Sequence, residues 1–573
     1  MADAGKSTAT APPGPKSSRA PGWLERDVEI GAALFLLALA TRIFHLRQIS
    51  ALDPYFLSPA TDGVLYHAWA QEIASGDWLG QGVFIMGPLY PYLMSAFYSL
   101  AGPDLALWKM FQAWLGAGSC MLVWWLAREV FDRRVALLAA AAAIFYEMLI
   151  FYGGTVMVVN IQVPLVLGLT IASVKCLHRG SLPRWFGVGI LVGLSALARQ
   201  TTLLYFPLLA GALLFALGSR QATRLSSGKR AAYLAALTLG LTLTLLPSAI
   251  RNAAVAGDFV IANSTAGMNL YMGNNSGSDG RWRAPRISRG RVDTPAAMQK
   301  AFKEVAEART QKELRPSEVS SYWTERALDF ILAEPGRWLA LEGRKFLLFI
   351  NADEVWNNRS IDISRPSSFL LGGTLLNLGL VMPLGLLGMA LALPRWRDLF
   401  PLYAMVGTYL ASAMVFFVLS RYRMPAAAVL MVFAAHACVW LFETARNRRL
   451  APLAAAVCAL ALLFPLTRLD LAVPDMYMAH FNLANRHRDN GSMEAAVASY
   501  RVAIELNPRF NTSLNNLALV YQQIGKSDEA IMLWEELHRR ALLQGDPTLL
   551  ERAERRLRQL GANPPASSAA PSD

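Results

Sequence analysis

The sequence predicts an all-α protein that crosses a membrane many times and ends in a domain of repeated helices. Three observations predict this fold class. Of the 573 residues, 54% are hydrophobic and only 17% are charged, whereas a soluble protein carries about 25% charged residues. The apolar residues fall in runs that approach the roughly 20 residues needed to cross a bilayer, and the chain after Pro474 repeats at a helical period. A soluble enzyme, a collagen, a disordered chain and a disulfide-stapled secreted domain are excluded.

The chain begins with a tail and a first membrane span. Residues 1–27 are rich in Ala, Pro, Ser and Thr, with little that could be buried, so we predict a disordered cytoplasmic tail. The first span covers about residues 28–46. Because Arg42 interrupts its apolar run and no small-residue cleavage site follows, we expect a retained anchor and not a signal peptide.

Further apolar runs bring the total to about eleven transmembrane helices, in a membrane domain over residues 28–470. The later runs lie near residues 105–126, 135–152, 156–177, 185–198, 203–218, 231–250, 369–393, 399–418, 424–443 and 450–466. With the N-terminus in the cytoplasm, every short loop on that side is basic, as the positive-inside rule expects. Topology therefore explains the net charge of +13, and nucleic acid is not expected as a partner.

This topology places three segments outside the membrane, namely residues 47–104, residues 251–368 and the C-terminal repeats. We therefore expect a multi-pass protein of a plasma membrane, such as the bacterial inner membrane. Long outer loops favour chemistry at the outer face over a channel or a carrier. A receptor-like ectodomain is the alternative.

The first outer loop contains a predicted amphipathic helix that starts at Asp62. Tyr66, Trp69 and Ile73 recur at helical spacing, and Gly76 ends the pattern. A carboxylate at a helix N-terminus interacts with the free N–H groups of the first turn. Asp62 is therefore either a helix cap or a general base at the mouth of the membrane domain.

Other segments of the chain favour the general base over the helix cap for Asp62. They are Phe84-Ile-Met-Gly-Pro-Leu-Tyr-Pro-Tyr-Leu93 in the first loop, Gly193–Leu204 in a span, Arg251–Val260 and Asn269–Asn275 in the second loop, and Ser420–Pro425 in a late outer turn. In this order they resemble the GT-C glycosyltransferases, in the branch of protein O-mannosyltransferases and lipid A aminoarabinose transferases. In that family an aspartate soon after the first span and a tyrosine-bearing helix form the wall of the active site.

The resemblance implies a membrane glycosyltransferase that moves a sugar from a polyprenyl-phosphate donor, with inversion at the anomeric carbon. Asp62 would be the catalytic base. The residues expected to bind substrate are Tyr66, His67, Tyr90, Asn269 and Tyr271. The acceptor is left open as a protein, a lipid or a growing glycan.

Four arginines near the outer face predict where the donor phosphate binds. They are Arg199, Arg251, Arg421 and Arg423. An arginine within a membrane is costly without a partner, and guanidinium groups bind phosphate through two hydrogen bonds. Snorkelling or pairing with helix carbonyls is the alternative for each arginine, but convergence from distant segments favours phosphate.

A metal and a second acid are left open. Related transferases often carry an acidic residue where this chain has Met86-Gly87, and two adjacent acids where it has Asp62-Gly63. A bound divalent metal is therefore conceivable but is not required, and no other cofactor is expected. The cysteines lie in or beside apolar runs, so neither a disulfide nor a thiolate metal site is predicted.

Residues 475–560 repeat with a period of 34 residues. The matched pairs include Leu483 with Leu517, Gly491 with Gly525, and Tyr500 with Trp534. This pattern resembles two tetratricopeptide repeats, which the amphipathic helix Leu549–Leu560 is expected to cap. The groove of the repeats either binds a protein partner or only braces the outer loops, on which we expect the repeats to pack. Residues 561–573 are predicted to be a disordered tail.

Two stretches of the second outer loop are not assigned to a site. Arg281–Arg291 is basic and its apolar residues do not recur at the spacing of a helix or a strand. We therefore expect a loop that is solvated or touches anionic lipid. Tyr322–Leu341 has helical spacing and is predicted to lie on the membrane, with Glu342 and Lys345 as surface charges.

Other functions remain as alternatives. An oligosaccharide polymerase or ligase has similar spans and loops, but it leaves the Asp62 loop unexplained. A transporter or flippase with a scaffold tail would need a cavity that continues across the membrane. Motifs for ATP binding, dinucleotide binding and zinc-dependent proteolysis do not occur in the sequence.

Overall fold

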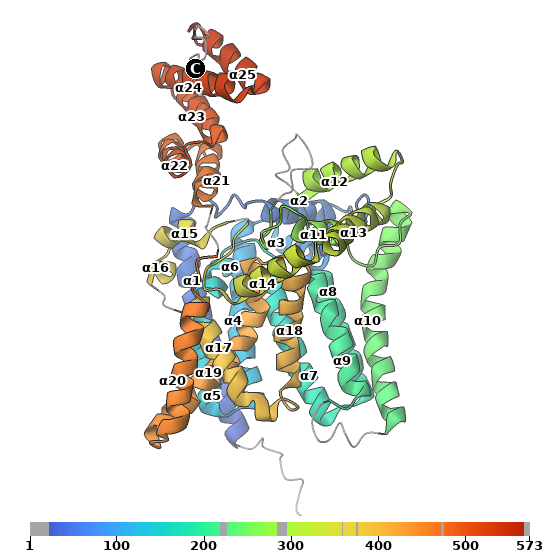
Figure 1. Cartoon of the computed structure of the whole chain (residues 1–573). Helices are drawn as coiled ribbons and strands as arrows, with labels where there is room; N and C mark the ends of the chain where they lie inside the picture. The colour runs from blue at the N-terminus through green and yellow to red at the C-terminus, as the bar shows by residue number, and fades with distance from the viewer. Residues whose placement is uncertain are drawn as a thin grey trace, which may run out of the picture.

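The computed structural model describes residues 22–217, 226–283, 295–357, 359–373, 376–471 and 475–565. Long apolar helices form a bundle, short helices cover one end of it, and a smaller helical domain projects from that end (Figure 1). Within the described ranges no strand forms, and one isolated bridge joins Arg281 to Val418. The all-α class is confirmed. Of the tails predicted to be disordered, 1–27 and 561–573, residues 1–21 and 566–573 lie outside the described residues. The prediction is wrong for residues 22–27, which begin the helix Gly22–Leu52.

In the described part of the chain, six helices are long and apolar enough to cross a membrane. They are α1 (Gly22–Leu52), α4 (Leu105–Val130), α7 (Val159–Arg179), α10 (Ser227–Ala256), α17 (Leu378–Ala392, continued by η4, Leu393–Arg395) and α19 (Ser420–Arg446). A seventh span results if α5 (Arg133–Phe145) and α6 (Glu147–Gly153), which meet at 49°, form one bent span.

Shorter apolar helices stand beside these spans (Figure 1). They are α8 (Leu182–Ala198), η1 with α9 (Gln200–Leu204 and Tyr205–Leu214), α18 (Phe400–Val415) and α20 (Leu450–Leu466). At 1.5 Å per residue they fall short of the roughly 30 Å of hydrocarbon. The total of about eleven spans includes these helices and therefore stays a prediction.

Helix α19 lies at the centre of the bundle, in contact with α4, α5, α7, α17 and α18. Its residues 423–435 are all buried, and many of them are alanines. Small side chains let neighbouring membrane helices approach closely. This packing fixes the N-terminal end of α19 beneath the outer loops.

The outer end is covered by elements of both long loops (Figure 1). These are α2 (Asp62–Ala74), α3 (Leu89–Ala101), α11 (Ala266–Gly273), α12 (Pro295–Thr310), α13 (Pro316–Ala333), α14 (Pro335–Ile350), α15 (Ile361–Ser364), η3 (Arg365–Ser367) and α16 (Phe369–Gly373). The single helix predicted over Tyr322–Leu341 is wrong, because Pro335 cannot donate the backbone hydrogen bond that would continue α13.

Glu342 and Lys345, which follow Tyr322–Leu341, were predicted to be surface charges but are placed differently in the structure. The Lys345 side chain is fully buried and donates to the Glu342 carboxylate at 2.7 Å and to Asn274 Oδ1 at 3.0 Å. Lys345 is therefore a packing element between α14 and the end of α11, and the surface placement predicted for the pair was wrong.

Two glycines hold α11 tightly against its neighbours. A Cβ added to Gly267 would lie 1.8 Å from the carbonyl oxygen of Ser320 on α13, and one added to Gly273 would lie 1.8 Å from that of Phe416. Only glycine permits such close backbone contact. Helix α11 is thus fixed between α13 and the segment that leads into α19.

The C-terminal domain has its own hydrophobic core. Its helices are α21 (Met476–Asp489), α22 (Met493–Leu506), α23 (Asn511–Gln523), α24 (Ser527–Gln544) and α25 (Pro547–Gln559). Tyr500 and Trp534, paired by the repeat, are both fully buried. Helix α25 packs on α24 through Leu549, Ala553 and Leu557, as expected of a capping helix.

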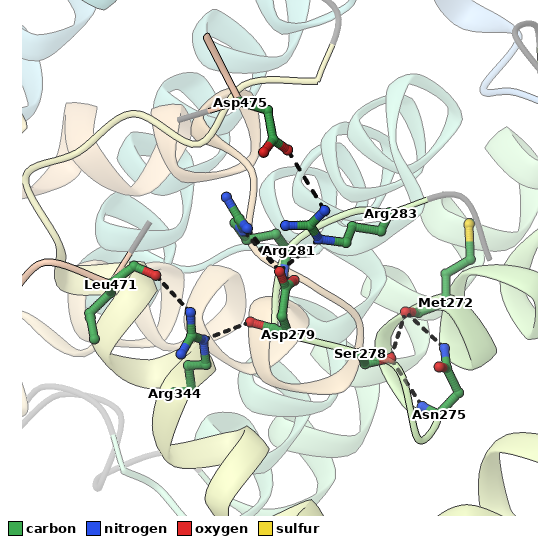
Figure 2. Close-up of polar contacts among 9 residues, drawn as sticks. All are labelled: Met272, Asn275, Ser278, Asp279, Arg281, Arg283, Arg344, Leu471 and Asp475. Atoms are coloured by element: carbon green, nitrogen blue, oxygen red, sulfur yellow. Dashed lines mark hydrogen bonds and ion pairs between the residues drawn. The ribbon is translucent and has the colours of Figure 1, made fainter. Parts of the chain in front are cut away.

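Ion pairs connect the second outer loop to the start of this domain. Asp279 accepts hydrogen bonds from Arg281 at 2.9 Å and Arg283 at 2.7 Å, and Arg283 lies 3.7 Å from Asp475 (Figure 2). Burial alone would raise the pKa of Asp279, but these hydrogen bonds hold it below the usual value. The described part of the basic stretch therefore binds a carboxylate within the protein, and residues 284–291 lie outside the described residues.

Backbone contacts complete the connection. Arg344 on α14 donates to the Leu471 carbonyl at 2.7 Å (Figure 2), Arg486 on α21 donates to Pro59 at 3.1 Å, and Asn490 donates to Pro54 at 2.8 Å. The contacts with the first outer loop come from α21 and its C-cap, while α22–α25 extend away from the bundle (Figure 1). The expected packing of the repeats on the outer loops thus holds for their first helix.

Candidate active site

A cavity of about 470 Å³ lies at the outer end of the bundle, among α2, α8, α11 and the N-terminal end of α19. Part of its wall is polar and includes Asp62, Arg199, Asn269 and Arg421. The apolar part of the wall comprises Val158, Leu203, Leu204, Met268, Met272, Met298, Val415, Phe416 and Phe417. The cavity suits a ligand with an anionic head and an apolar chain.

Asp62 and Arg421 form a buried ion pair in this wall. The Asp62 Oδ2 atom accepts a hydrogen bond from Arg421 Nη1, and the two side chains are 11% and 9% exposed. Within the described chain the Asp62 carboxylate accepts no bond from the first turn of α2, so the capping alternative is wrong. The preceding Thr61 has a φ of 43°, a strained value for a β-branched residue.

Arg199 and Tyr422 extend the polar wall beyond this pair. The Arg199 guanidinium lies 3.0 Å from the ring centroid of Tyr422, and the Tyr422 hydroxyl is 3.5 Å from Arg421 Nη2. Arg199 follows α8 with an extended backbone, and its Nε donates to Thr201 at 3.3 Å. Arg199 and Arg421 carry one more charge than Asp62 neutralises, and the positive end of the α19 dipole lies beside Arg421. This arrangement can bind a phosphate.

Tyr66 and Asn269, two of the residues predicted to bind substrate, also line the cavity. Tyr66 is 2% exposed, and burial together with the nearby Asp62 charge raises its pKa, so its hydroxyl remains a donor at neutral pH. Asn269 belongs to α11, whose position the two tightly packed glycines fix.

Two of the four predicted phosphate-binding arginines do not line this cavity. Arg251 donates to the carbonyls of Leu79 and Gly82 and lies 4.1 Å from the Phe84 ring centroid. Arg251 therefore holds the first outer loop in place through these hydrogen bonds, and it lines a neighbouring cavity. The prediction that Arg251 converges with the other three arginines on one phosphate site is therefore wrong.

Arg423 is the second correction. Its guanidinium donates to the carbonyls of Leu348 at 3.0 Å and Asn351 at 2.7 Å, and it pairs with Glu354 at 2.9 Å. These partners come from α14 and the segment after it. Pairing with carbonyls, the alternative for each arginine, applies to Arg423.

Three predicted substrate-binding residues have partners elsewhere. His67 Nδ1 lies 2.8 Å from the Tyr98 hydroxyl. Tyr90 is fully buried and donates to Gln112 at 2.5 Å. The Tyr271 ring packs on Trp323 at 4.6 Å. None of the three lines the cavity, and their contacts position α2, α3 and α11.

Sequence reasoning did not single out Tyr422, although it lies between Arg421 and Arg423, in a segment predicted to be an outer turn that instead begins helix α19. In the described part of the chain, no group of three or more His, Cys, Asp or Glu side chains is placed to hold a metal ion. The donor set around Asp62 consists of one carboxylate with arginines and therefore does not fit a divalent metal.

Comparison with known proteins identifies two regions. Residues 86–248 match the profile of the family described as dolichyl-phosphate-mannose-protein mannosyltransferase, and residues 484–525 match a TPR repeat. The resemblance to GT-C glycosyltransferases with C-terminal tetratricopeptide repeats is thereby confirmed.

Solved structures and one curated protein are also similar. The oligosaccharyltransferase of Archaeoglobus fulgidus in its apo form is 13% identical with a TM-score of 0.45, over 83% of this chain and 60% of that chain. ArnT from Cupriavidus metallidurans bound to undecaprenyl phosphate is 15% identical with a TM-score of 0.34, over 75% of this chain and 80% of that chain. The photosystem I assembly protein Ycf3 of Rippkaea orientalis is 32% identical over 63 residues, 10% of this chain and 36% of that protein.

Proposed function

We propose that the protein is a membrane glycosyltransferase that moves a sugar from a polyprenyl-phosphate donor to an acceptor hydroxyl at the outer face, with inversion. The observation that carries this proposal is the cavity in which the buried Asp62–Arg421 pair meets Arg199 and apolar walls. One cavity thus offers a proton acceptor, two cations for a phosphate and apolar surface for a prenyl chain. The family match over residues 86–248 supports the reaction class.

The mechanism begins with a change of partner for Arg421. In the structure, Arg421 neutralises the Asp62 carboxylate. A donor phosphate between Arg199 and Arg421 attracts the Arg421 hydrogen bonds, and Asp62 is then free to accept a hydrogen bond from the acceptor hydroxyl.

Transfer follows as a single displacement. Asp62 takes the proton while the acceptor oxygen attacks the anomeric carbon, and the bond from that carbon to the phosphate oxygen breaks. Polyprenyl phosphate leaves with one more negative charge, which Arg199 and Arg421 balance. A single displacement inverts the configuration.

Replacement of Asp62 by asparagine tests this function. Asparagine cannot accept the proton, so Asp62→Asn is expected to lose transfer by about 10²–10⁴-fold. The assay is release of undecaprenyl phosphate from a radiolabelled lipid-linked sugar in membranes that contain the native acceptors. The variant is expected to fold and to bind undecaprenyl phosphate, because Arg421 is retained, but with lower thermal stability than wild type, because Arg421 loses its buried partner.

Glu72→Gln is the matched control, because Glu72 is exposed on the same helix, α2. This variant should transfer at the wild-type rate. A purified Asp62→Asn protein that is as active as wild type would end the assignment of Asp62 as the base.

A further inference from the structure

A second, smaller cavity adjoins the candidate active site. It measures about 40 Å³ and shares Arg421 and Asn357 with the larger cavity. Its lining also includes Lys109, Arg359 and Tyr55, and no Asp or Glu is among the described residues that line it. Since a buried water occupies roughly 10–15 Å³ on this measure, the space holds a group of a few polar atoms.

Lys109 is the most unusual member of this lining. It lies in the second turn of α4, and its side chain is 1% exposed. Its ammonium donates to the Phe56 carbonyl at 2.5 Å and lies 4.3 Å from the Phe56 ring centroid. Among the described residues no carboxylate pairs with it. A buried ammonium without a counter-ion is unfavourable, so an anion in this cavity would stabilise the charged form of Lys109.

The two arginines also have unused donors. Arg359 pairs with Asp53, and Arg421 pairs with Asp62. The Nε atoms of both arginines are buried and have no acceptor in the described structure. When Lys109 is charged, three cations surround the cavity with two carboxylates as partners, which leaves one positive charge for an anion to balance.

A neutral donor completes the lining. Burial raises the pKa of Tyr55 to about 12, so its hydroxyl stays protonated at neutral pH. An ammonium, two guanidinium groups and a phenol are donors that suit a tetrahedral oxyanion.

We propose that this second cavity binds a phosphate group distinct from the donor phosphate held by Arg199 and Arg421. The proposal rests on the proposed function, since it takes the larger cavity as the donor site. The phosphate has two chemical sources. It belongs either to an acceptor that carries a phosphate near its reacting hydroxyl, or to a donor linked through a diphosphate.

The test measures binding of radiolabelled inorganic phosphate to the full-length protein in lipid nanodiscs saturated with undecaprenyl phosphate. The lipid fills the larger cavity, so one phosphate per protein is expected to bind beside it. Lys109→Met keeps the length of the side chain and removes its charge. It is expected to weaken phosphate binding at least tenfold while binding of undecaprenyl phosphate is unchanged.

Tyr55→Phe and Lys300→Met complete the set of variants. Tyr55→Phe removes one hydroxyl with little effect on packing, and it is expected to weaken phosphate severalfold even if Lys109→Met fails to fold. Lys300→Met removes a largely exposed lysine of α12, 79% accessible, and is expected to bind phosphate as wild type does.

The outcomes separate this inference from the proposed function. If undecaprenyl phosphate binds but inorganic phosphate does not, or if Lys109→Met and Tyr55→Phe bind phosphate as wild type does, the second phosphate site is refuted. If undecaprenyl phosphate itself fails to bind, the proposed function fails.

A parallel arm with undecaprenyl diphosphate identifies the source. Exclusion of inorganic phosphate by this lipid, but not by the monophosphate, assigns the cavity to a diphosphate donor. Binding of phosphate beside both lipids assigns it to the acceptor.

Discussion

At the scale of single residues, Arg421 and Arg423 are two positions apart and have different partners. Arg421→Gln is expected to bind undecaprenyl phosphate at least tenfold more weakly, because a charged hydrogen-bond donor to phosphate is lost. Arg423→Gln leaves Glu354 buried without its cation, which is expected to cost about 3–5 kcal/mol of stability. Lipid binding and thermal unfolding of both purified variants measure the two effects.

Asp62→Asn combined with Arg421→Gln is the control for this comparison. The double change removes both charges of the pair, so it is expected to recover stability lost in Arg421→Gln without recovering lipid binding. Weaker lipid binding in Arg423→Gln at a temperature where it is fully folded would contradict the division of roles.

The sequence indicated Asp62 and Arg421 through family-like segments, and the structure brings them together. It could not indicate which arginines face a cavity. Arg251 and Arg423 bind carbonyls contributed by segments distant in the chain, and hydropathy carries no information about such partners. Lys109 was missed for the same reason, since the carbonyl to which it donates belongs to Phe56, in the first outer loop.

At the scale of elements, the two glycines of α11 fix the cavity wall that carries Asn269. Gly273→Ala places a methyl group where the Phe416 carbonyl lies. We expect a loss of about 1–3 kcal/mol of stability from overpacking and a lower transfer rate, because α11 shifts. Thermal unfolding and the transfer assay measure these effects.

Gly343→Ala is the matched change on α14, where an added Cβ meets nothing within 4 Å. Alanine favours a helix over glycine by up to about 1 kcal/mol, so this variant should be as stable as wild type or more so. An equal loss in both variants would show that the close contact of α11 is not the cause.

The apolar runs predicted most of the long and short apolar helices of the bundle to within a few residues, because long apolar runs have few other ways to avoid water. The errors occur where a helix breaks. The run over residues 369–393 divides into α16 and α17, whereas the break at Arg199, between α8 and η1, falls in the gap between the predicted spans 185–198 and 203–218. Tertiary contacts, and not local propensity, decide such breaks.

At the scale of the whole molecule, the predicted orientation places the outer loops and the repeats on one side. Figure 1 shows the start of α10 at the end of the bundle opposite α21. Cysteines substituted for Ser276 and Thr512, both exposed, are expected to react with an impermeant maleimide in intact spheroplasts, because the predicted orientation places both outside the cell. A cysteine at the exposed Ser227 should react only after lysis. The reverse pattern would place the chemistry in the cytoplasm.

Asp62 and Arg421, the buried ion pair of the cavity, are 359 residues apart in the chain. This separation determines when during its synthesis the protein can first form the complete site. At about 5–20 residues per second, roughly 20–70 s pass between emergence of the aspartate and of its arginine. If Asp62 is the base, as proposed, a nascent chain released early carries it without its counter-charge and has no transfer activity. Two fragments, residues 1–397 and 398–573, should each lack transfer activity when expressed alone. Transfer activity should return only when the two are co-expressed and associate in the bilayer. The order of translation thus delays catalysis until the last membrane helices have been inserted.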